Sequence, residues 1–150
     1  MSIKKIIVEE IESLLGVREK FDTLYHGTSK EGAKDIQANG IDINKSEGGY
    51  FGTGFYTTSD YNLAKSNYAD FADEEGGAIL EFRLSPEANI LDLRDSDDFE
   101  IWKPYSREIF KPTHPQALIQ ARIDGLYDNS FEGVVIFNTS VLTLVDTHWL

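Results

Sequence analysis

Short apolar runs bounded by turn residues outnumber the amphipathic segments of this chain, and the two kinds do not alternate regularly. Runs rich in β-branched and aromatic side chains predict strands, and they cover 23–26, 55–58, 78–84, 89–93, 134–137 and 141–145. Helical spacing or capping residues predict helices over 2–15, 29–38, 60–71 and 117–123. A doubly wound fold requires strands and helices to alternate. The order therefore predicts an α+β fold with mostly antiparallel sheets.

Side chains that cap helices set the expected boundaries. Thr28 or Ser29 can cap the second predicted helix, because a short hydroxyl side chain accepts a hydrogen bond from the first turn. Asn39-Gly40 ends the same helix. Ser59 or Asp60 can cap the third predicted helix in the same way.

Other segments are expected to be less regular. Residues 41–53 contain several glycines and no apolar period, which predicts a mobile loop. Three prolines within 103–115 predict irregular structure. The acidic run 95–98 indicates a helix N-terminus with a solvated face. The last two predicted strands flank Asn138-Thr139 and are expected to pair as antiparallel neighbours.

Length and charge narrow the possible classes. A chain of 150 residues with 41% hydrophobic content predicts one domain over 1–150, with 1–20 as an N-terminal helical segment. The absence of cysteine excludes disulfides, thiolate metal sites and a cysteine nucleophile. A net charge of −12 disfavours bulk binding of RNA or DNA and of anionic lipid.

The N-terminus and the hydropathy pattern indicate a location. The apolar run before Glu9 and Glu10 is shorter than the core of a secretory signal. No stretch has the length of a membrane span. We therefore expect no membrane association, and a protein that works in a cytoplasm, either that of the producing cell or that of a target cell.

Three motifs occur in an informative order. Tyr25-His26-Gly27-Thr28-Ser29 comes first, 49–56 follows with the letters GYFGTGFY, and Asn67-Tyr68 comes one helix later. Their order and spacing resemble the ADP-ribosyltransferase superfamily, in the branch of diphtheria toxin and the poly(ADP-ribose) polymerases. That branch uses a histidine–tyrosine–glutamate triad. The resemblance covers the region of these motifs well and the last third of the chain loosely.

The resemblance implies a fold of two packed, mostly antiparallel sheets with flanking helices, and a site for NAD⁺ as substrate without a metal. Tyr56 and Tyr68 would hold the cationic nicotinamide ring between their faces, through stacking and cation–π attraction. Gly27 would offer its backbone N–H and C=O to the carboxamide. His26 would bind a hydroxyl of the adenosine ribose, assisted by Thr28 or Ser29. Residues 41–53 would cover the dinucleotide.

Cleavage of the glycosidic bond develops positive charge on the ribose, so the site needs a carboxylate. By resemblance Glu132 is the catalytic acid, because it directly precedes the apolar run 134–137. The family places its glutamate one residue closer to the aromatic residue of that strand, so a β-bulge at Gly133 is expected. Asp128 is the alternative acid. Ser130 occupies the position where the arginine-specific branch has an acid or glutamine, so arginine specificity is not indicated.

The implied activity is mono-ADP-ribosylation of an unknown acceptor, most simply a protein, with release of nicotinamide. A bacterial toxin, an effector or a phage-encoded modifier would suit the small size. Two alternatives stay open. One is a related RNA 2′-phosphotransferase, which the acidic charge disfavours, and the other is a non-catalytic module that binds NAD⁺ or ADP-ribose. His114 and His148 lack partners at metal-ligand spacing in the sequence and are expected on the surface.

Overall fold

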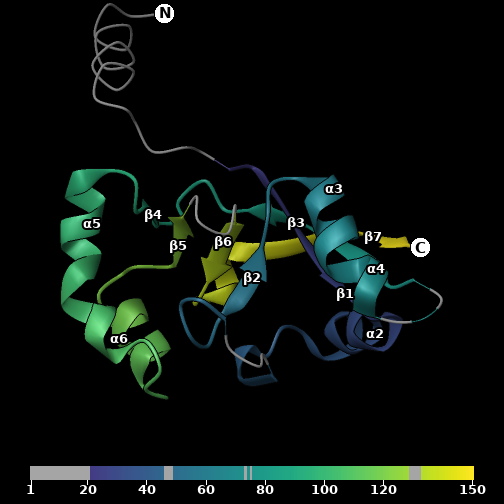
Figure 1. Ribbon diagram of the computed structural model, residues 1–150, viewed down its shortest axis with the longest axis horizontal. Coiled ribbons are helices and arrows are strands. Elements are labelled where there is room, and N and C mark those ends of the chain that lie inside the picture. The colour runs from purple at the N-terminus through teal and green to yellow at the C-terminus, as the bar shows by residue number, and fades with distance from the viewer. Residues whose placement is uncertain (1–20, 46–48, 73, 75, 129–132) are drawn as a thin grey trace, which may run out of the picture.

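A computed structural model describes residues 21–45, 49–72, 74, 76–128 and 133–150. The fold is α+β and contains two separate sheets (Figure 1). The first sheet has the order β1-β3-β7 and is antiparallel throughout. Its strands are β1 (Thr23–Thr28), β3 (Ala78–Leu84) and β7 (Leu142–Trp149). The predicted helix at 2–15 lies outside the described residues.

The second sheet has the order β2-β6-β5-β4. Its strands are β2 (Phe55–Thr57), β6 (Gly133–Ile136), β5 (Gly125–Asp128) and β4 (Ile90–Asp92). Strand β4 runs parallel to β5, while the other pairs are antiparallel, so this sheet is mixed. Strand β5 was not predicted from the sequence.

The expected pairing of the last two strands is wrong. Strand β6 pairs with β2 and β5, whereas β7 pairs with β3 in the other sheet. The connection between them is a 3-10 turn, η4 (Thr139–Val141), in which Asn138 accepts a hydrogen bond from the N–H of Ser140. This turn replaces a two-residue hairpin and carries the chain from one sheet into the other.

The helices gather at the two ends of the molecule (Figure 1). Helices α2 (Lys30–Asn39), α3 (Tyr61–Ala64) and α4 (Asp70–Ala72) lie beside the first sheet, and α5 (Ser96–Trp102) and α6 (His114–Gln120) lie beyond β4 and β5. Shorter turns are η1 (Ile43–Lys45), the π-helical turn η2 (Lys65–Ala69) and the 3-10 turn η3 (Lys103–Glu108). No helix in these described segments has the length and apolar character needed to cross a bilayer.

The predicted caps of α2 and α3 are confirmed. Ser29 accepts a hydrogen bond from the N–H of Gly32, and Gly40 follows α2 with a φ of 81°. Asp60 accepts from the N–H groups of Asn62 and Leu63 at the start of α3. From α3 the chain continues through η2 into α4, so the predicted helix at 60–71 exists but contains a π-helical turn.

The helices at the other end differ more from expectation. Asp95 caps α5 as the acidic run predicted, but Asp98 is buried and accepts a hydrogen bond from the N–H of Asp92. Helix α6 begins at His114, within the segment expected to be irregular. A proline in the first turn suits a helix, because that turn leaves its N–H groups unpaired anyway.

Among the described residues, three apolar clusters fill the interior, and the smallest of them joins α3 and η2 to β3. The first joins the inner face of the β1-β3-β7 sheet to β6 around Leu24, Leu80 and Phe82. The second lies between the other sheet and the α5–α6 end, around Trp102 and Leu118. Burial of this kind contributes about 25 cal/mol per Å² of apolar surface and is the main source of stability.

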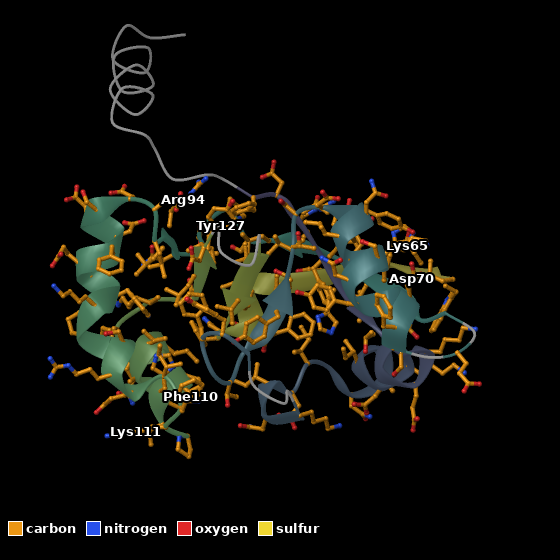
Figure 2. The ribbon with its side chains drawn as sticks, in the orientation of Figure 1. Lys65, Asp70, Arg94, Phe110, Lys111 and Tyr127 are labelled. Atoms are coloured by element: carbon orange, nitrogen blue, oxygen red, sulfur yellow. The ribbon has the colours of Figure 1, made fainter. Side chains whose placement is uncertain are left out.

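Ion pairs between charged side chains lie at both ends of the molecule (Figure 2). Arg94 donates to both carboxylate oxygens of Asp92, and its guanidinium lies 4.5 Å from the centre of the Tyr127 ring. Lys65 and Asp70 form an ion pair of 3.1 Å beside α4. Phe110 is 84% exposed.

Candidate functional site

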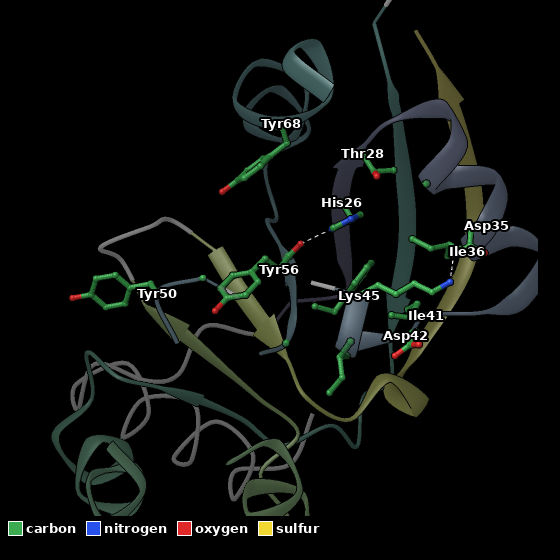
Figure 3. A pocket seen from close by; sticks show the side chains of 15 residues that line it. His26, Thr28, Asp35, Ile36, Ile41, Asp42, Lys45, Tyr50, Tyr56 and Tyr68 are labelled. Carbon is green, nitrogen blue, oxygen red and sulfur yellow. Dashed lines mark hydrogen bonds and ion pairs between the residues drawn. The ribbon is translucent and has the colours of Figure 1, made fainter. Parts of the chain in front are cut away.

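The candidate site lies where the two sheets meet. Strands β1 and β2 are the edge strands of their sheets, and one bridge joins them. At this bridge the N–H of Tyr25 donates to the carbonyl of Thr58 at 2.7 Å, and the N–H of Thr58 donates to the carbonyl of Tyr25 at 2.9 Å. Beyond it the ladder stops, and a cavity of about 470 Å³ is lined by residues of both strands (Figure 3).

His26 stands at the separation of the two strands. Its ring stacks on Phe55 with centroids 4.1 Å apart, and its Nδ1 lies 2.6 Å from the carbonyl oxygen of Tyr56. A carbonyl can only accept, so Nδ1 carries the hydrogen. Burial lowers the pKa of His26, and the hydrogen bond to the Tyr56 carbonyl only partly opposes this. The imidazole is therefore neutral at pH 7, with Nε2 left as a hydrogen-bond acceptor.

Gly27 presents its backbone toward the same separation. The backbone groups of Tyr25 face β2, and alternation along a strand directs those of Gly27 to the same side, away from β3. Among the described residues neither group has a hydrogen-bond partner. The strand edge thus offers one donor and one acceptor side by side.

Helix packing explains why position 27 is glycine. A Cβ on Gly27 would overlap the carbonyl oxygen of Ala64 and would lie 2.8 Å from the Cβ of Tyr68. The absence of a side chain lets η2 approach β1 closely. This approach places Tyr68 beside the strand that carries His26.

Tyr56 is held by the turn at 49–52. Its hydroxyl donates to the carbonyl of Gly52 at 2.7 Å and accepts from the N–H of Phe51 at 3.0 Å. Gly49 packs on the ring, since a Cβ there would lie 2.5 Å from the Cζ of Tyr56. Burial raises the pKa of Tyr56, so its hydroxyl is neutral at pH 7. The ring is therefore fixed in orientation and uncharged.

The structure brings together most of the predicted site residues. His26, Thr28, Tyr56 and Tyr68 all line the cavity, and Tyr68 points toward it from η2 with 46% of its surface exposed (Figure 3). Gly27 and Ser29 are not among the lining residues, and the hydroxyl of Ser29 caps α2.

The predicted acids are not placed in the cavity. Glu132 lies outside the described residues. Asp128 ends β5 opposite Gly133 and is not among the residues that line the cavity. The expected bulge at Gly133 is wrong, since Gly133 pairs with Asp128 in a regular ladder.

At the far end of the cavity, residues 41–53 were expected to cover a dinucleotide, but no single residue there was named and the part played by α2 was not expected. Asp35 and Ile36 from α2 and Ile41, Asp42 and Lys45 from the segment after it line this end (Figure 3). Lys45 donates to Asp35 at 2.8 Å, and this bond lowers the pKa of Asp35 and raises that of Lys45. In the sequence, the available indication was that these residues follow the first motif closely along the chain.

The two other histidines also differ from expectation. His114 is buried, and its ring meets Phe137 edge-on at 5.7 Å. His148 is partly buried and lies 3.0 Å from a carboxylate oxygen of Glu81 and 3.9 Å from one of Asp146. Both were expected on the surface, without partners at metal-ligand spacing in the sequence. The pairing of β3 with β7 makes the His148 contacts, and one sequence cannot show such a pairing.

No family model matches the chain, and searches of the curated proteins and of the solved structures found no match. The geometry of the cavity therefore has to carry the functional argument.

Proposed function

We propose that the chain is an NAD⁺-dependent mono-ADP-ribosyltransferase with an ADP-ribosyltransferase-like fold. It would transfer ADP-ribose to an acceptor, most simply a protein, and release nicotinamide. One observation carries the proposal: His26, Tyr56 and Tyr68 come from three separate elements and line one cavity at the junction of two sheet edges. A volume of about 470 Å³ is within the range of pockets that bind small molecules and cofactors.

The tyrosine end of the cavity suits nicotinamide. A pyridinium ring carries positive charge and is attracted to aromatic faces by about 0.5–2 kcal/mol each. Tyr56 and Tyr68 supply two such faces, and both are present in one cavity. The free backbone N–H and C=O of Gly27 match the C=O and N–H₂ of a carboxamide. Together they would hold the leaving group in a fixed plane.

His26 suits a ribose hydroxyl. Its Nδ1–H is used by the carbonyl of Tyr56, which leaves Nε2 to accept from an O–H group. A protonated histidine would lose this acceptor and would repel the cationic ring. The burial that lowers the pKa of His26 therefore favours the state that binding requires.

The catalytic carboxylate is assigned to Glu132. Strand β6, which Glu132 precedes in the sequence, pairs with the strand that carries Tyr56. A carboxylate near the nicotinamide ribose would stabilise the positive charge that develops as the glycosidic bond breaks. That charge appears only in the transition state, so the acid should affect turnover more than binding.

The decisive measurement is nicotinamide release from NAD⁺ by the purified chain, followed by mass spectrometry of candidate acceptors. We expect Glu132→Gln to lower turnover by about 10²–10³, as expected when one electrostatic stabiliser is lost, and to change NAD⁺ affinity much less. Glu87→Gln, an exposed residue outside the cavity, is the matched control and should behave like the wild type. If Glu132→Gln retains near-normal turnover, the acid is misassigned and Asp128→Asn is tested next.

Two outcomes would replace the proposal. Binding of NAD⁺ without nicotinamide release, unchanged by Glu132→Ala, would indicate a recognition module. Turnover that depends on RNA with a 2′-phosphate would indicate a phosphotransferase.

A further inference from the structure

The end of the cavity away from the tyrosines has an apolar wall. Ile36 projects from α2, and Ile41 and Ile43 come from the segment that follows it. In Figure 3 Ile36 and Ile41 lie on the opposite side of His26 from Tyr50 and Tyr68. A flat nucleobase gains free energy when it leaves water and packs against such an apolar surface. On the proposed function, with nicotinamide at the tyrosines, this end receives the adenosine half of the dinucleotide.

Charged groups border this apolar wall. Asp42 lies between two of the isoleucines in the sequence, and one of its carboxylate oxygens accepts from the N–H of Asn44 at 3.0 Å. Asp35 accepts from Asn39 and from Lys45, each at 2.8 Å. Lys45 is the one cation that the described residues contribute to the cavity lining, and Asp35 neutralises it. Two carboxylates and one ammonium leave this end with a charge of −1 (−2 + 1).

A carboxylate and a ribose make a selective pair. An ionised carboxylate only accepts hydrogen bonds, so it binds the hydroxyls of a ribose and repels a phosphate in the same place. Dinucleotide enzymes of other folds distinguish NAD⁺ from NADP⁺ by this chemistry, with an acid for the 2′-hydroxyl and a cation for the 2′-phosphate. A 2′-phosphate carries about −1.5 to −2 charges at pH 7 if it titrates like a phosphorylated hydroxyl side chain.

We propose that Asp42 binds the 2′-hydroxyl of the adenosine ribose, and that the Asp35–Lys45 ion pair keeps Lys45 from accepting a 2′-phosphate. The substrate is then NAD⁺ and not NADP⁺, and the two aspartates are its specificity-determining residues. This inference rests on the proposed function, because it uses the orientation of the dinucleotide in the cavity.

Isothermal titration calorimetry with ADP-ribose and with 2′-phospho-ADP-ribose tests the inference without requiring turnover. We expect the wild type to prefer ADP-ribose by roughly tenfold or more, the scale of one screened charge–charge contact. Asp42→Asn should reduce that ratio severalfold, because ADP-ribose binds more weakly and the 2′-phosphate is repelled less. Asp35→Asn should reduce the same ratio, because Lys45 is released from its ion pair and strengthens the binding of 2′-phospho-ADP-ribose. The double variant should bind the two ligands about equally.

Asp97→Asn is the matched control, since Asp97 is exposed on α5 and its loss changes the charge equally without touching the cavity. A ratio that is the same in all variants, with ADP-ribose still bound, would overturn the inference and leave the proposed function standing. A wild type that binds 2′-phospho-ADP-ribose more tightly than ADP-ribose would also overturn the inference and leave the proposed function standing. If the folded wild type binds neither ligand, the proposed function fails and the inference fails with it.

Discussion

His26 and His114 lie in different environments, since His26 is partly buried and lines the cavity whereas His114 is fully buried. His26 gives its Nδ1–H to the carbonyl of Tyr56, so burial leaves it neutral and oriented. His114 is buried at the start of α6, and neither ring nitrogen has a hydrogen-bond partner among the described residues. On the proposed function, the first arrangement orients His26 for a ligand contact. The second carries the cost of an unsatisfied polar group, about 1–3 kcal/mol.

His114→Leu tests this cost and its pH dependence. Burial lowers the pKa of His114, with Glu108 opposing the shift in part. Above the unfolded pKa of about 6.5 both states are neutral, and the group adds no pH dependence. As pH falls below 6.5 the unfolded state takes up a proton first, so stability is lost until the folded pKa is reached.

We therefore expect the free energy of unfolding of His114→Leu to fall less than that of the wild type between pH 7 and pH 5. At pH 8 the variant should be as stable as the wild type or more stable, by up to about 1–3 kcal/mol. Urea titrations at several pH values measure both quantities. Parallel pH profiles for the two proteins would show that His114 gains a partner that neutralises its charge.

At the level of elements, local sequence signals predicted the helix ends and most strands well, but they did not predict how the strands pair. Helix α2 was predictable because Ser29 and Gly40 mark its ends within the sequence itself. Strands β6 and β7 were each recognised, but their partners depend on contacts between distant segments, which one sequence does not reveal. Strand β5 was missed because its glycine and aspartate are poor strand residues in isolation.

The same division applies to the site. His26, Tyr56 and Tyr68 were predicted because their motifs are contiguous and ordered. The segment 41–53 was expected to cover the dinucleotide, but the ion pair between Lys45 and Asp35 was not predicted, because it depends on the turn η1 and on how α2 lies beside it. Such a contact follows from the fold and has no motif.

Gly27→Ala tests the close contact between β1 and η2. The new methyl group would displace Ala64 and Tyr68, so we expect a loss of about 1–3 kcal/mol in stability. Affinity for NAD⁺ should also fall by at least about tenfold, since one aromatic face is displaced. Thermal unfolding and calorimetry give the two values.

Gly125→Ala provides the comparison. A Cβ there would lie 2.6 Å from the carbonyl oxygen of Val135, in the core of the other sheet and away from the cavity lining. Gly125→Ala should lower the stability by a similar amount and leave the affinity for NAD⁺ unchanged. Equal loss of affinity in both variants would mean that the Gly27 effect is general destabilisation.

Over the whole molecule, the site lies at the junction of two sheets, and the surface around it belongs to a strongly acidic protein. A net charge of −12 produces a negative field that extends about one Debye length, roughly 10 Å at 0.1 M salt. A small dinucleotide with little net charge is nearly indifferent to that field. On the proposed function, a protein acceptor would feel that field, because its surface charge determines how often it meets the cavity in a productive orientation.

If the proposed function holds, the charge predicts that a basic acceptor is modified faster than an acidic one, and that only this step depends on salt. We expect transfer of ADP-ribose to a lysine- and arginine-rich protein to slow severalfold between 25 and 300 mM NaCl, because screening removes the steering. Hydrolysis of NAD⁺ to free ADP-ribose in the same samples should change little, since water is its acceptor. Mass spectrometry of the modified protein and chromatography of nicotinamide give the two rates. If both rates fall together, salt acts on the fold or on the NAD⁺ site. If transfer to an acidic protein is the faster reaction, acceptor choice is governed by contacts near the cavity and not by the overall field.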